Sequence, residues 1–156
     1  MRKSRRVMPV AAAISTLLTV IVHAAPPSED GKAAFERRQD TMKHMGRSLY
    51  LGIGRVVKGT AAYGPDTVTA AETVAAIAST LDGTLFALGS DVAESKIKPE
   101  IFSANGQVEK LIAAVRTATA ELVPAVKSGD KAVIAAAFGA VNDACNACHK
   151  EFRKEE

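Results

Sequence analysis

A short string in the last quarter of the sequence carries two thiols and an imidazole: Cys145-Asn146-Ala147-Cys148-His149. In an α-helix, at 100° per residue, the side chains of Cys145, Cys148 and His149 project from one face. Two thiols at this spacing can add across the two vinyl groups of one haem, and the adjacent imidazole can reach the iron. We therefore expect one covalently attached haem c. The alternatives are a thiol redox pair and a structural disulfide.

The elements that carry this string are expected to be helices. Of the 156 residues 47% are hydrophobic and 4% are aromatic, with no Trp, so aliphatic side chains must fill the core. Glycines, prolines and the string Ser128-Gly129-Asp130 divide the chain into segments. None of these segments has the alternating pattern of a strand. The expected helices run from about Asp30 to Lys58, from Pro65 to before Gly83, from Pro99 onward and from about Lys131 to Lys154.

Three details of these helices can be predicted as well. Ser28 or Asp30 is the expected N-cap of the first helix, and Gly59 is expected to end it. Thr84 to Lys98 is a looser stretch, and Pro124 should kink or end the third helix. A thiol redox pair usually starts a helix of a βαβ unit, whereas Cys145 and Cys148 end a helix in an all-α chain, which makes the redox alternative the weaker one. The pattern predicts an up-and-down four-helix bundle.

The first residues have the pattern of a secretory signal peptide. A positive segment, Met1 to Arg6, precedes an apolar run of 13 residues from Val10 to Val22, and cleavage is expected after Ala24. That run is shorter than the roughly 20 residues that span a bilayer, so we expect no membrane anchor after cleavage. The predicted organisation is a signal peptide over residues 1–24 and one bundle domain over residues 25–156.

The signal peptide also accounts for the positive charge. The whole chain has 20 Lys and Arg against 17 Asp and Glu, a net charge of +3. Four of the basic residues and none of the acidic ones lie in residues 1–24, which leaves 16 against 17, or −1. A mature chain of this charge gives no compositional support for nucleic acid as a partner.

Several strings together resemble one family. Arg38-Gln39-x-x-Met42 and Phe138-Gly139-Ala140-Val141, followed by Cys145-x-x-Cys148-His149-x-x-Phe152-Arg153, are similar to the cytochrome c-prime family, the class II c-type cytochromes. The resemblance covers essentially the whole mature chain. It implies an antiparallel up-and-down four-helix bundle that encloses one haem c and is exported to the periplasm of a Gram-negative bacterium. Further matching segments are Val57-Lys58-Gly59, Phe86, Gly89-Ser90 and Lys98-Pro99-Glu100-Ile101.

The same resemblance implies roles for single residues. Cys145 and Cys148 would be the thioether positions, His149 the proximal iron ligand, and Arg38 and Gln39 residues that line the haem. A guanidinium at the core-facing position of Arg38 needs an acceptor, and a haem propionate would supply one. The chain departs from the family pattern in having Phe102 and Lys96, which do not touch the iron.

The sixth coordination position decides between two functions. Relatives with a bulky apolar residue at the Met42 position are five-coordinate, and relatives with Met there are low-spin. After signal removal only Met42 and Met45 remain as thioethers, and thioether sulfur suits haem iron. The alternative is that both are ordinary core methionines. We expect Met42 to be the distal ligand, and His44, about 200° away around the helix, to face solvent.

The functional prediction is a periplasmic monohaem cytochrome that carries single electrons between donor and acceptor proteins and catalyses no reaction of its own. In the second hypothesis Met42 stays off the iron or is displaced, and the distal pocket admits nitric oxide or carbon monoxide. The third is a thiol redox protein that uses Cys145 and Cys148. Small residues on the first helix, such as Gly46 and Gly52, allow either a monomer or a homodimer.

Overall fold

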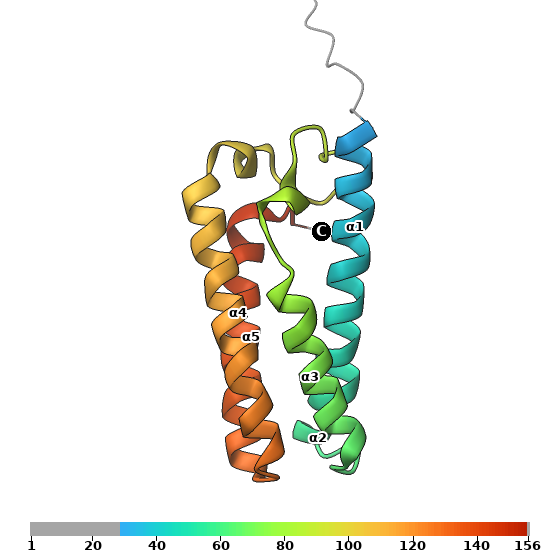
Figure 1. Ribbon diagram of the computed structural model, residues 1–156, viewed down its shortest axis with the longest axis vertical. Helices are drawn as coiled ribbons and strands as arrows, with labels where there is room; N and C mark the ends of the chain where they lie inside the picture. Colours follow the sequence, from blue (N-terminus) through green and yellow to red (C-terminus); the bar gives the residue numbers. More distant parts are fainter. Residues whose placement is uncertain (1–28, 156) are drawn as a thin grey trace, which may run out of the picture.

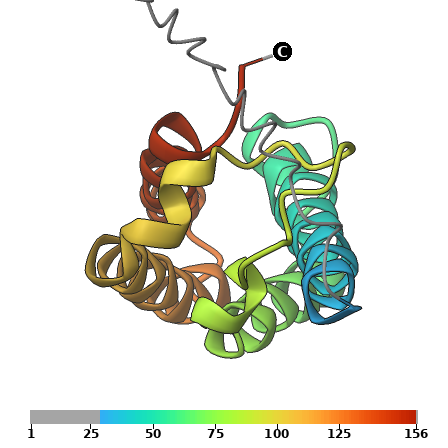
Figure 2. The same ribbon diagram turned by 90° about the horizontal axis from the view of Figure 1, so that it is seen from above.

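Four long helical stretches pack as an antiparallel up-and-down bundle in the computed structural model, which describes residues 29–155 (Figure 1). The predicted signal peptide, His23 and the proposed cap Ser28 lie outside the described residues. Consecutive stretches pack against each other, and seen along the bundle axis the four surround a common interior (Figure 2). Among the described residues, no helix has the length and apolarity needed to cross a membrane. The fold prediction is confirmed.

The first stretch changes its winding partway along. It begins as α1 (Glu29–Arg47), continues as a π-helical segment over Ser48–Gly54, and ends as the short α2 (Arg55–Val57). Gly59 follows at φ +74°, a left-handed conformation that favours glycine and stops the helix, as predicted. The π-helical segment was not predicted, because its apolar residues also fit the ordinary helical period.

The remaining helices begin at their predicted residues with one exception. α3 spans Pro65–Ser79, and α5 spans Lys131–Phe152 with the Asp130 carboxylate accepting from the amides of Ala132 and Val133. Pro99 opens a 3₁₀ turn over Pro99–Ser103, and the third long helix, α4, spans Asn105–Lys127.

The prediction that Pro124 could end the third helix was wrong, because α4 continues through it to Lys127, and the alternative of a kink stays a prediction. The proline lies in the last turn, where its missing N–H costs a single helical bond. Leu122 and Val126 on either side of it are fully buried. Their burial favours the helical conformation through the end of α4.

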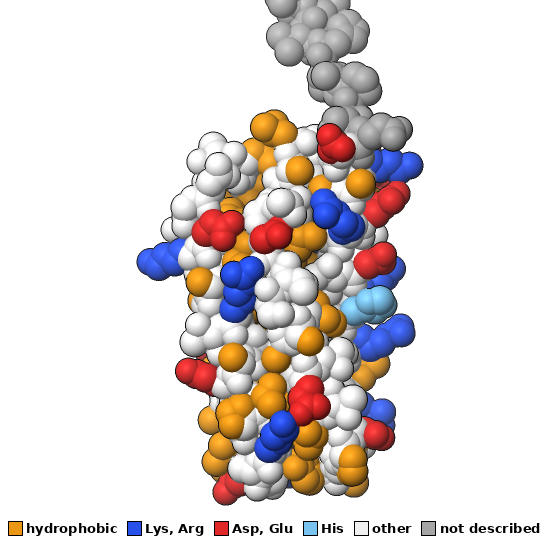
Figure 3. Space-filling model, in the orientation of Figure 1, with side chains coloured by type: hydrophobic (Ala, Val, Ile, Leu, Met, Phe, Trp, Pro, Cys, Tyr) orange, Lys and Arg blue, Asp and Glu red, His pale blue; other side chains and the backbone are white. Residues whose placement is uncertain are grey.

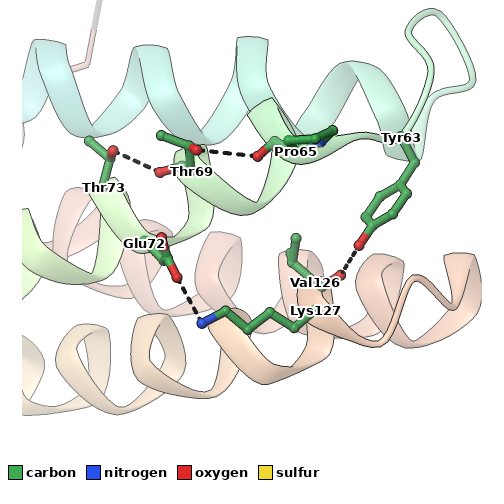
Figure 4. A network of polar contacts seen from close by, with 7 residues as sticks. All are labelled: Tyr63, Pro65, Thr69, Glu72, Thr73, Val126 and Lys127. Atoms are coloured by element: carbon green, nitrogen blue, oxygen red, sulfur yellow. Dashed lines mark hydrogen bonds and ion pairs between the residues drawn. The ribbon is translucent and has the colours of Figure 1, made fainter.

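The bundle is packed most closely at the end where α3 begins and α4 ends. Ile53, Val74, Leu122, Val126 and Ile134 are there, all with at most 1% of their surface exposed. Polar contacts reinforce this end (Figure 4): the Tyr63 hydroxyl donates to the Val126 carbonyl at 2.9 Å, and Lys127 pairs with Glu72 at 2.7 Å. On the face seen in Figure 3, basic and acidic side chains are interspersed.

Candidate functional site

A cavity of about 810 Å³ occupies the opposite end of the bundle. Its walls come from α1 and the π-helical segment, from the first half of α4, from the last two turns of α5 and from the loop over residues 81–97. Most of the lining side chains are apolar. They include Phe35, Leu49, Phe86, Ile101, Leu111, Ile112 and Phe152.

α5 contributes both thiols and the imidazole to this cavity. Cys145, Cys148 and His149 line it together, as their spacing predicts, and all three are half-buried. The two cysteines are not joined in a disulfide. Burial raises the pKa of both thiols, and the charges of Glu151 and Cys145 add to the rise at Cys148.

The surroundings of the imidazole favour its neutral form. Burial lowers the pKa of His149, and the neighbouring charge of Arg153 lowers it further, which favours the neutral ring that can bind a metal. Two thiols and a neutral imidazole on one wall of a large, mainly apolar cavity fit a haem held by two thioethers and one axial nitrogen. The side chains that could hold a haem and the cavity around them therefore both fit this group.

α1 contributes Met42 and Met45 to the same cavity. Met42 is half-buried and Met45 is 6% exposed, and both belong to the lining. The structure therefore brings Met42 and His149, which are 107 positions apart in the sequence, to one cavity. Iron ligation by Met42 remains a prediction. His44 is exposed and absent from the lining, which confirms its outward position.

Arg38 has a different set of acceptors from the one predicted. Its guanidinium is 6% exposed and donates to the Leu85 carbonyl, to the carbonyl and hydroxyl of Ser90, and to the Ser95 hydroxyl, at 2.7 to 3.0 Å. The sequence argument assumed that a propionate would be needed as acceptor, but the loop satisfies the guanidinium. Arg38 and the exposed Gln39 both line the cavity, and their contact with haem remains a prediction.

Sequence reasoning missed the loop as a part of the site. Residues 94–97 line the cavity, and Ile97 forms an isolated antiparallel bridge with Arg153, just beyond α5. Ser90 and Ser95 are almost fully buried. Gly89-Ser90 matched the family pattern, but the sequence of the loop does not indicate which distant donor its serines accept from.

Comparisons with known proteins agree with this geometry. The family model described as Cytochrome C' matches residues 33–153. A cytochrome c' of Rhodocyclus tenuis is 35% identical over 95 residues, which cover 58% of this chain and 71% of the relative. The solved cytochrome c' of Thermochromatium tepidum superposes with a TM-score of 0.72 at 30% identity, covering 84% of this chain and 100% of that one.

A carbon monoxide-bound variant of cytochrome c prime from Alcaligenes xylosoxidans superposes with a TM-score of 0.70 at 27% identity. The match covers 80% of this chain and 97% of that one. The sequence match, the bundle and the cavity with its two thiols and imidazole lead to the same conclusion. The chain belongs to the cytochrome c' family, whose members carry one covalently attached haem c.

Proposed function

We propose that Cys145 and Cys148 hold the haem by two thioether bonds and that His149 is its proximal axial ligand. The support is their shared place in the cavity wall and the neutral form of the imidazole. The haem, when bound, supplies an iron that can change oxidation state or take a small ligand. The protein holds the haem, excludes water with an apolar lining and controls access to the iron.

The function that we propose is binding of a diatomic gas, nitric oxide or carbon monoxide, at the iron on the side of α1. The observation that carries it is the match of the bundle to the Alcaligenes xylosoxidans relative, whose solved structures hold carbon monoxide and nitric oxide. Met42 and Met45 line the α1 wall of the cavity, and a gas binds there only when neither thioether occupies the iron.

The second candidate is the single-electron carrier, which Met42 itself favours. If its sulfur stays on the iron, the iron keeps its ligands during a redox change, and His/Met ligation raises the reduction potential. Periplasmic donor and acceptor proteins would then be the partners. This low-spin, methionine-ligated type receives no support from the comparisons, which favour gas binding.

One experiment separates the two candidates. The protein is produced in a host that matures c-type haem, and its ferric spectrum and the binding of carbon monoxide to its ferrous form are measured. High-spin ferric iron with rapid carbon monoxide binding supports the gas-binding protein. Low-spin ferric iron with the near-red sulfur-to-iron band, and a ferrous form that carbon monoxide leaves unchanged, would contradict it in favour of the carrier.

The same preparation tests attachment, export and assembly. Haem that stays with the denatured polypeptide after acid extraction excludes the thiol redox alternative. We propose export to the periplasm, so the purified chain should begin at Ala25. One solved cytochrome c' shows ligand-controlled dimer dissociation. We propose a homodimer here, which sedimentation with and without carbon monoxide checks. No catalytic reaction is proposed.

A further inference from the structure

The buried guanidinium of Arg38 joins the first helix to the loop that walls the cavity. Four hydrogen bonds of the guanidinium end on residues between 85 and 95, two on carbonyls and two on serine hydroxyls. The Arg38 guanidinium carbon also lies 5.7 Å from the ring centres of Phe35 and Phe86. Both rings line the cavity. The group is therefore held on the wall by neutral acceptors and by aromatic faces.

Burial of the charged guanidinium of Arg38 costs free energy. Among the described residues, no carboxylate forms an ion pair with the guanidinium, and the charge of Asp91, next to Ser90 in the loop, only partly offsets the burial that lowers the pKa of Arg38. A buried charge is stable only when its hydrogen bonds are well made, and here every acceptor comes from one loop. The backbone of the loop also lies directly against α1, because a Cβ on Gly31 would be 2.5 Å from the carbonyl carbon of Gly89.

The other side of the loop is fastened to the end of α5. The Lys98 amide donates to the Phe152 carbonyl, and the Lys154 amide donates to the Lys96 carbonyl, both at 2.7 Å. Ser95 connects the two attachments, since its hydroxyl accepts from Arg38 and from the Ile97 amide, and Ile97 pairs with Arg153. A chain of direct contacts thus runs from α1, through the loop, to the helix that carries His149.

We propose that Arg38 is a positioning residue that fixes the loop and so sets the spacing between the cavity wall with Met42 and the wall with His149. Arg38 lies one helical turn before Met42 on the same face of α1. Arg153 lies four residues after His149, just beyond the end of α5, at the other end of the contacts. The proposal rests on the proposed haem site for its effect on the iron, whereas its effect on the loop does not depend on that site.

The test uses the haem-loaded protein and three changes. Arg38→Met removes all four hydrogen bonds, and the double change Ser90→Ala with Ser95→Ala removes the two hydroxyl acceptors while Arg38 stays. Arg37→Met is the matched control, since it removes the same charge from an exposed neighbour outside the cavity lining. Amide hydrogen exchange of residues 85–98 and the rate of carbon monoxide association with the ferrous form are measured in each.

Arg38→Met should speed exchange of the loop amides by more than tenfold, because it removes four hydrogen bonds to a charged group. The double serine change should speed it by roughly tenfold, because it removes two of these bonds together with the acceptor of the Ile97 amide. Both changes should alter the carbon monoxide rate, and Arg37→Met should alter neither. If Arg38→Met prevents folding, the double serine change decides alone.

Two results would overturn the proposal. Unchanged exchange in Arg38→Met, or in the double serine variant if Arg38→Met does not fold, would contradict the role of the Arg38 contacts in fixing the loop. A carbon monoxide rate that changes with Arg38→Met but not with the serines would show that Arg38 acts directly on the haem. Failure of the parent to bind carbon monoxide would contradict the proposed function only, and the amide exchange would still decide the role of Arg38.

Discussion

At the end of the bundle where α3 begins and α4 ends, buried aliphatic side chains fill the interior, whereas the end where α5 finishes encloses a cavity of about 810 Å³. The pocket beside Gly59 and Gly129 at the close-packed end is about 160 Å³, about one fifth as large. The two ends of the bundle therefore have different roles. The close-packed end supplies stability, and the cavity end depends on hydrogen bonds from a loop and on the haem it holds.

The largest expected difference between the two ends of the bundle comes from truncating a leucine toward each end of α4. Leu122 is fully buried at the close-packed end, so Leu122→Ala should lower the free energy of unfolding by about 2–5 kcal/mol and leave the haem spectrum unchanged. Leu111 is half-buried in the cavity wall, so Leu111→Ala should cost less but shift the spectrum. Denaturant unfolding and absorbance check both, and equal losses of stability would refute the division.

A glycine tests how tight the close-packed end is. A Cβ on Gly52 would lie 2.3 Å from the Ala70 Cβ on α3. Gly52→Ala should therefore force the two helices apart, at a cost of about 1–3 kcal/mol in the free energy of unfolding. Gly139→Ala is the control, since no atom lies within 4 Å of its Cβ, and it should stabilise α5 by about 0.5–1 kcal/mol. Thermal unfolding of both variants is the measurement.

At the cavity end, the paired changes Met42→Leu and Met45→Leu should act on the iron rather than on stability. Either swap nearly conserves volume and should cost less than about 1.5 kcal/mol. Met42→Leu should speed carbon monoxide association, because no thioether competes at that position, and should leave any initially low-spin ferric iron high-spin. Met45→Leu should leave rate and spin state unchanged. Flash photolysis and electron spin resonance test this, and identical behaviour of the two variants would argue against a special role for Met42.

The smallest expected effect concerns the start of the loop. The Thr84 hydroxyl donates to the Asp82 carboxylate and lowers its pKa below 3.8. Because the pKa is lower in the folded state, the contribution to stability is present above about pH 4 and is lost as the pH falls through the folded-state pKa. Thr84→Val should raise the Asp82 pKa and leave stability at pH 7 within about 0.5 kcal/mol, since the site is exposed. Carbon-13 NMR titration measures this, and an unmoved pKa would contradict it.

The helices and their ends could be predicted because their determinants are local. Pro65 supplies a fixed φ where α3 begins, and Gly59 and Gly129 adopt φ of +74° and +70°. Pro99 is the exception, because it opens a 3₁₀ turn and α4 begins only at Asn105. The thiols and imidazole of α5 could be placed together for the same reason, since they lie within five residues on one helix. Pro124 misled the prediction, because its effect depends on how deeply the neighbouring Leu122 and Val126 are buried.

The contacts of Arg38 could not be predicted from the sequence. Its acceptors lie 47 to 57 residues away in a loop with little regular structure. Their pairing depends on how the loop lies against α1, which no local pattern determines. Burial of Arg38 suggested only that an acceptor must exist. The π-helical segment Ser48–Gly54 packs against α3, and no local pattern in its sequence indicates its winding.

The bridge between Ile97 and Arg153 has a consequence for the order of events during folding. The loop can be fastened to the end of α5 only after residues 152–154 have been made, and these follow the Cys-x-x-Cys-His string in the chain. Its contacts with Arg38 need no residue beyond Ser95, so the α1 side of the loop can form first. The cavity wall is therefore completed by the last residues of the chain that the structure describes.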